Sequence, residues 1–170
     1  MSFLELAKER YSCRKYTDQK VEKEKIDQII EAAIAAPTAN NQQPFKLFLP
    51  ESEDAIAKVN ETTNCIFGCR TVIAVGGLAE TGWVRASDGR PFADVDASIV
   101  GTHILLAAHD LGLGSCWVGW FDEPKFRELF PETAGYDMVG LFPIGYPAED
   151  AHPAKLHTQR KDRSELVEEL

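Results

Sequence analysis

The 170-residue sequence predicts one domain that mixes helices and strands, of the α+β or α/β class. Three observations support this. The length is near the commonest domain size, and the content of 44% hydrophobic and 26% charged residues is that of ordinary globular proteins. Segments with helical periodicity alternate with short apolar segments typical of strands. The sequence has no repeat, low-complexity tract or linker, so we expect a single domain over residues 1–170.

The helices are predicted from apolar spacing and from residues that begin or end helices. In residues 22–36, apolar side chains recur along one helical stripe. A later helix, ending at Leu111, is apolar on most of its circumference, which places it at the centre of the core. Gly112 is its expected stop, and Asp94 or Asp96 is its expected N-cap. Shorter helices are predicted over residues 2–10, over residues 52–60 and, after a cap at Asp122, around Phe126.

Four strands are predicted where apolar residues alternate with polar ones or run together, over residues 45–49, 72–75, 116–121 and 138–144. A long loop over residues 79–93 separates the second strand from the long helix and contains Trp83. Loops of this length usually have a function.

The formal net charge of −9 argues against a nucleic acid or an anionic membrane as the partner, because each binds a basic surface. The charge is unevenly distributed: residues 1–16 carry a net +2 and residues 155–163 a net +3, which leaves −14 for the rest. Two basic islands at the ends of an acidic chain indicate a small anion site. Terminal charges that are merely solvated are the alternative.

The sequence lacks the features of a membrane or secreted protein. Its apolar stretches are far shorter than the roughly 20 residues that span a bilayer, and no cleavable leader is recognisable. The four cysteines and the histidines have no spacing typical of a metal site, and a domain of this length folds without disulfides. We therefore expect free thiols, no metal and a cytoplasmic location.

The first candidate binding segment is residues 10–14. If this segment is extended, Arg10, Ser12 and Arg14 lie on one face, where two guanidinium groups and a hydroxyl suit a phosphate. A surface strand with solvated arginines is the alternative. Cys13 lies between the arginines, and a lowered thiol pKa is a further hypothesis.

Two other segments are candidates. Residues 38–43 form an amide-rich loop between two prolines, and amides suit the edge of a flat heterocycle. An ordinary turn explains the same composition. In residues 112–119, glycines permit close approach of the backbone to a ligand, although a helix stop explains the first two glycines equally well.

Taken together, these segments resemble the nitroreductase family of flavin-dependent oxidoreductases. Arg10-Tyr11-Ser12-Cys13-Arg14 is similar to the family's R-x-S-x-R start, and residues 36–45 are similar to its A-P-S-x-x-N-x-Q-P-W segment. Residues 112–119, residues 144–147 and Arg160-Lys161 follow in the family's order. The resemblance covers essentially the whole chain.

The resemblance implies an α+β fold with a central mixed or antiparallel sheet flanked by helices, built as an intertwined homodimer with FMN at the interface. One subunit would hold the phosphate and the pyrimidine edge of FMN, and the other would supply an amide-rich loop. FMN carries the hydride chemistry in such proteins, so no catalytic side chain is predicted. By position, the implied cofactor-binding residues are Arg10, Ser12, Arg14, Pro37, Thr38, Ala39, Asn41, Gln43, Trp117, Val118, Gly119 and Arg160.

The implied function is that of an oxidoreductase that takes a hydride from NAD(P)H and reduces a small acceptor, such as a nitroaromatic or a quinone, by a ping-pong mechanism. Trp83 and its loop are expected to cover the acceptor, with Trp117 or Phe121 as further stacking surfaces. A non-catalytic FMN carrier or sensor and a dimer without cofactor are the alternatives. Thr158 stands where many relatives carry a Lys; either phosphate binding is weaker, or Lys155 or Lys161 substitutes.

Overall fold

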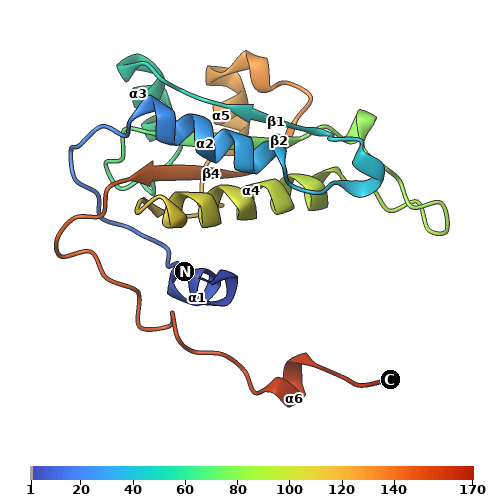
Figure 1. Cartoon of the computed structure of the whole chain (residues 1–170). Coiled ribbons are helices and arrows are strands. Elements are labelled where there is room, and N and C mark those ends of the chain that lie inside the picture. Colours follow the sequence, from blue (N-terminus) through green and yellow to red (C-terminus); the bar gives the residue numbers. More distant parts are fainter. Residues whose placement is uncertain (1) are drawn as a thin grey trace.

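The computed structural model describes residues 2–170 and shows a four-stranded sheet with helices on both faces (Figure 1). The strand order is β1-β2-β4-β3, and every pair of neighbouring strands is antiparallel. This arrangement confirms the α+β class. The strands are β1 (Phe45–Phe48), β2 (Val72–Gly77), β3 (Gly114–Ser115) and β4 (Asp137–Gly145).

The helices form one layer on each side of the sheet. In Figure 1, α2 and α4 lie on one side, and α3 and α5 lie on the other. Short 3-10 turns occupy residues 39–41, 79–81 and 131–133. The α-helices are α1 (Phe3–Glu9), α2 (Lys23–Ile34), α3 (Glu53–Thr62), α4 (Ala93–Asp110), α5 (Glu123–Leu129) and α6 (Arg163–Leu166).

The inner strand β2 explains why the chain has two apolar cores. Successive side chains of a strand point to opposite faces. Ile73 and Val75 pack into the core with α2 and α4, whereas Val72 and Ala74 pack into the core with α3 and α5. Because both faces are covered, all six residues of β2 are buried.

Helix α4 lies at the centre of the first core, as the sequence predicts, and eight of its residues are buried. Its C-terminal stop is confirmed: Gly112 has φ +75°, and its N–H donates to the carbonyl of His109 at 3.0 Å. The predicted N-cap is wrong. Phe92 caps the helix without a side-chain bond, and Asp94 and Asp96 lie in the first turn, where the dipole favours acidic residues.

The strand predicted over residues 116–121 is also wrong in extent. Only Gly114 and Ser115 pair with β4, and Val118 alone forms a bridge farther along, with Leu141. The indole of Trp117 lies against Gly140 instead, at a place where a side chain on residue 140 would clash. In the register of Ser115 with Ile144, Cys116 stands opposite Pro143 of β4, which has no N–H to donate to the ladder.

Both ends of the chain extend away from the layers (Figure 1). Helix α1 has no buried residue, and Phe3 and Leu4 are 72% and 61% exposed. The segment after β4 leaves Leu156 and Leu166 exposed as well. Among residues 2–170, no helix is both long enough and apolar enough to cross a bilayer.

The packing of α4 predicts the effect of adding one methyl group. A Cβ on Gly101 would lie 2.5 Å from Cζ of Phe142 and 3.2 Å from Cζ3 of Trp117. We expect Gly101→Ala to destabilise the protein by about 1–3 kcal/mol, which exceeds the gain of about 1 kcal/mol from helix propensity. Urea unfolding measures the change. Gly119→Ala is the control, because a Cβ there meets no atom within 4 Å; equal stability of the two variants would contradict the prediction.

Candidate active site

The two basic islands of the sequence meet in the structure. A hollow of about 250 Å³ is lined by Arg10, Ser12 and Arg14 from the first island and by Arg160 from the second. The structure thus brings the two ends of the acidic chain to one hollow, and its use as an anion site stays a prediction.

The chain holds this site through the extended segment that follows α1. Ser12 forms a parallel bridge with Ser115, and the N–H of Cys13 donates to the carbonyl of Ser115 at 2.9 Å. The hydroxyl of Tyr16 donates to the carbonyls of Cys13 (2.9 Å) and Pro143 (3.3 Å). The extended segment thus places Arg10, Ser12 and Arg14 on one hollow, which Tyr11 lines as well.

The electrostatics of the hollow favour an anion. Nη1 of Arg10 is buried and has no hydrogen-bond partner among residues 2–170. Burial lowers the pKa of the Arg10 guanidinium, and the charge of Arg160 lowers it further. Within residues 2–170, none of the three arginines pairs with a carboxylate. A phosphate bound in the hollow would supply the missing negative charge.

The C-terminal part of the hollow is built by backbone contacts. Nη1 of Arg160 donates to the carbonyls of His157 and Gln159, both at 2.7 Å. Thr158 is exposed, and Nζ of Lys161 faces Oε2 of Glu165 at 3.8 Å. Neither Lys155 nor Lys161 lines the hollow, so Arg160 is the cation that the second island contributes here.

The amide-rich loop between α2 and β1 forms a second group. The hydroxyl of Thr38 accepts the N–H of Gln43 at 3.1 Å, and the Gln43 side chain donates to the carbonyl of Asn41 at 3.2 Å. Asn40, Asn41 and Gln43 all have φ between 52° and 54°. Three residues other than glycine in the left-handed region make this a strained loop. Pro37 precedes it and is exposed.

Ala39 connects this loop to the core. Its N–H donates to Oδ1 of Asp96 at 2.9 Å. Asp96 is a functional candidate that the sequence reasoning missed, because an acidic residue near the start of a helix is ordinarily explained as a cap.

Trp117, Val118 and Gly119 form a third group beside α4. The indole N–H of Trp117 donates to the carbonyl of Val139 at 2.9 Å, and its ring lies 4.9 Å from that of Phe142. Trp117 also lines an open hollow of about 390 Å³ over the first half of α4. Val118 is buried through its bridge to β4, whereas Gly119 is exposed.

The long loop that contains Trp83 folds back on itself. Val84 and Pro91 form an antiparallel bridge, so residues 84–91 are a short hairpin. The ring of Trp83 meets that of Phe92 edge to face at 5.0 Å. Trp83 is therefore fixed at the base of a hairpin immediately before α4.

One chain does not bring all the predicted residues together. Arg10 shares a small hollow of about 120 Å³ with His109, in the last turn of α4. The amide-rich loop is bound to Asp96, in the first turn. Thirteen residues of helix separate Asp96 from His109, which is about 20 Å along the axis. The arginine group and the loop group thus lie at opposite ends of α4.

His109 is a second residue that the sequence reasoning did not place near the site. Its Nε2 is buried and unpartnered in residues 2–170. Burial lowers the pKa of the imidazole, Arg10 lowers it further, and Glu9 and Asp110 raise it. Nothing in the sequence indicates that His109 lies close to Arg10.

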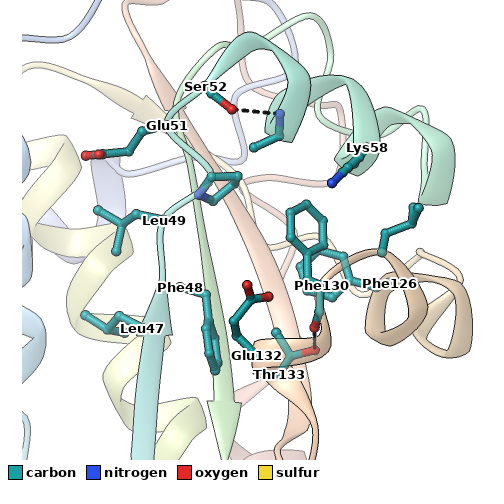
Figure 2. A pocket seen from close by; sticks show the side chains of 13 residues that line it. Leu47, Phe48, Leu49, Glu51, Ser52, Lys58, Phe126, Phe130, Glu132 and Thr133 are labelled. Carbon is teal, nitrogen blue, oxygen red and sulfur yellow. Dashed lines mark hydrogen bonds between the residues drawn. The ribbon is translucent and has the colours of Figure 1, made fainter.

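A cavity of about 520 Å³ on the other side of the sheet contains none of the predicted site residues (Figure 2). It lies between the end of β1, α3 and α5, and Phe48, Phe126 and Phe130 line it. Lys58 points toward the ring of Phe130, 6.0 Å from its centroid. Residues 2–170 contain no group of three or more side chains suited to hold a metal ion.

Comparison with known proteins identifies the family. The sequence pattern of the nitroreductase family matches residues 7–67 and 61–146, which together are most of the chain. The chain belongs to the nitroreductase family. Two of the segments that resemble this family, residues 10–14 and residues 36–45, contribute to the hollow and contain the strained loop.

Individual relatives and solved structures of the nitroreductase family are also similar to this chain. A protein of Methanothermobacter thermautotrophicus with the provisional name NADH dehydrogenase/NAD(P)H nitroreductase is 31% identical, covering 94% of this chain and 88% of its own length. The crystal structure of a nitroreductase family protein from Clostridium difficile 630 is 37% identical with a TM-score of 0.91, covering 99% and 98% of the two chains. A nitroreductase of Desulfovibrio desulfuricans in complex with FMN is 26% identical with a TM-score of 0.80, covering 98% and 95%.

The burial of the thiols predicts their reactivity. The structure has four free cysteines, of which Cys65 alone is not buried. Burial raises the pKa of Cys69 to about 11 and raises that of Cys116, although Arg14 opposes the latter shift. At pH 8 only about 0.1% of Cys69 would be thiolate. We expect iodoacetamide to alkylate Cys65 first, as measured by peptide mass spectrometry, with all four equal in denaturant. Equally fast labelling of Cys13 in the native protein would contradict this.

Proposed function

We propose that this member of the nitroreductase family is an FMN-dependent oxidoreductase that takes a hydride from NAD(P)H and reduces a small acceptor. The observation that carries the proposal is the hollow that unites three arginines, none of which pairs with a carboxylate in residues 2–170. The FMN complex of the Desulfovibrio relative and the name of the Methanothermobacter relative support it. The proposal includes a single domain over residues 1–170, working in the cytoplasm.

The hollow suits the phosphate of FMN. Arg10 and Arg160 would bind its oxygens, and Ser12 would donate its hydroxyl, since charge-assisted bonds to phosphate are the strong ones. Arg14 would supply positive charge at the pyrimidine edge, where negative charge develops on reduction. Trp117, Val118 and Gly119 would border the ring system.

The proposal requires a homodimer. In one chain, the arginine group and the loop of residues 37–43 lie about 20 Å apart along α4. Pro37, Thr38, Ala39, Asn41 and Gln43 of one subunit would therefore meet the FMN held by the arginines of the other. The exposed apolar residues of α1 and of the C-terminal segment offer the surface that a second chain would cover.

The residues present indicate which roles belong to the protein and which belong to FMN. When bound, FMN supplies the ring that accepts and returns a hydride. The protein binds, orients and shields: Arg14 stabilises negative charge, and Trp83 at the base of its hairpin covers the acceptor, a nitroaromatic or a quinone. Donor and acceptor would use the same space in turn, which is a ping-pong scheme. A carrier or sensor that binds FMN without turnover requires the same hollow and differs only in its response to NAD(P)H.

The visible spectrum tests the proposed reaction. We expect the purified protein, or the protein with FMN added, to show a flavin spectrum that bleaches under anaerobic NADH or NADPH and returns when a quinone is added. Initial rates at several concentrations of both substrates should give parallel double-reciprocal lines. A flavin spectrum that neither nucleotide bleaches would support the carrier. A protein that binds no FMN would refute the proposal.

The role of Arg10 is tested by comparing two flavins. Arg10→Ala should weaken FMN binding about 10–100-fold, the loss expected for a charge-assisted hydrogen bond. Riboflavin, which lacks the phosphate, should bind both proteins equally. Quenching of flavin fluorescence measures both affinities. Arg163→Ala is the control, because Arg163 is exposed and faces Glu169 away from the hollow. An equal loss for FMN and riboflavin would show that Arg10 does not hold the phosphate.

A further inference from the structure

The side chain of Asp96 is a buried carboxyl group with one described contact. The residue is 1% exposed, in the first turn of α4. Its Oδ1 accepts the N–H of Ala39 at 2.9 Å, whereas its Oδ2 is buried without a hydrogen-bond partner in residues 2–170. No cation lies within ion-pair distance of it in that part of the chain.

Such an arrangement is unfavourable for stability. A buried carboxylate without a cation and with a free oxygen is costly, and the positive end of the α4 dipole offsets only part of that cost. The beginning of the helix does not need this residue, since Asp94 in the same turn is exposed and already complements the dipole. The function of the Asp96 carboxylate is therefore found in its one partner, the loop.

That loop needs an external support. Asn40, Asn41 and Gln43 adopt left-handed φ values of 54°, 53° and 52°. Residues in such conformations persist only where the surroundings hold them. The bonds of Thr38 and Gln43 tie the loop to itself, whereas the bond from Ala39 to Asp96 ties it to α4.

We propose that Asp96 is a positioning residue, whose buried carboxylate fixes the strained loop of residues 37–43 on the first turn of α4. This inference rests on the proposed function: by fixing the loop, Asp96 holds it in the conformation that contacts FMN. A charged acceptor holds an amide about twice as strongly as a neutral one. This explains why a carboxylate occupies a buried position where an apolar residue would be less costly.

Amide hydrogen exchange followed by mass spectrometry tests the positioning in the protein without flavin. In Asp96→Ala, peptides covering residues 37–43 should exchange about 10–100-fold faster, because one charge-assisted bond is lost. Asp96→Asn keeps a neutral acceptor for the Ala39 N–H and should restore part of the protection. Asp94→Ala, the matched change in the same turn, should leave this loop as in the wild type.

Two results would overturn the assignment: unchanged exchange of the loop in Asp96→Ala, or equal acceleration of all peptides, which would make Asp96 a general stabilising residue. FMN affinity, measured by fluorescence quenching, should fall about 10–100-fold in Asp96→Ala and recover in Asp96→Asn. Faster loop exchange with unchanged affinity would overturn the link to the cofactor. If the wild type binds no FMN, the proposed function fails, while the exchange rates still decide whether Asp96 fixes the loop.

Discussion

The close contact between α4 and the sheet is the constraint on which the rest of the structure depends. Gly101 lets the ring of Phe142 and the indole of Trp117 approach the helix backbone. This contact fixes the distance between α4 and β4, and with it the position of the segment after β3. Both ends of α4 then carry functional candidates: Asp96 and its loop at the first turn, His109 and Arg10 at the last.

The charges at the two ends of α4 match its dipole. Asp96 lies in the first turn, at the positive end, and Arg10 lies beside the last turn, at the negative end. The dipole stabilises each charge but supplies no hydrogen bond, and each side chain keeps one buried polar atom without a described hydrogen-bond partner. Buried polar groups in proteins are nearly always paired. Arg10 lies in a segment that resembles the nitroreductase family, and Asp96 accepts a hydrogen bond from Ala39 in another such segment. At these two positions the fold therefore gives up stability next to residues of the candidate site.

The sequence predicts the helices, the strands and the arginine group, but it does not predict the tertiary contacts between these segments. Local geometry brings Arg10, Ser12 and Arg14 to one hollow as alternation predicts, although Tyr11 lines the same hollow. The strand predicted over residues 116–121 is wrong in extent because Pro143 of β4, a partner distant in sequence, has no N–H to offer residue 116. Asp96 was mistaken for a cap because its partner, Ala39, lies 57 residues earlier in the chain. Pattern reasoning detects periodicity, whereas partners of this kind are fixed only by tertiary packing.

The exposed ends of the chain complete the argument for a site shared between subunits. The dispersal of the candidate residues to both ends of α4 would be unexplained in a monomer. Phe3, Leu4 and Leu156 are exposed on segments that extend beyond the two layers, an unfavourable arrangement unless another surface covers them (Figure 1). The same segments flank Arg10 and Arg160. Under the proposed function, a second chain that covered this apolar surface would lie next to the arginines, where its own loop of residues 37–43 is needed. Assembly and cofactor binding would then depend on one surface.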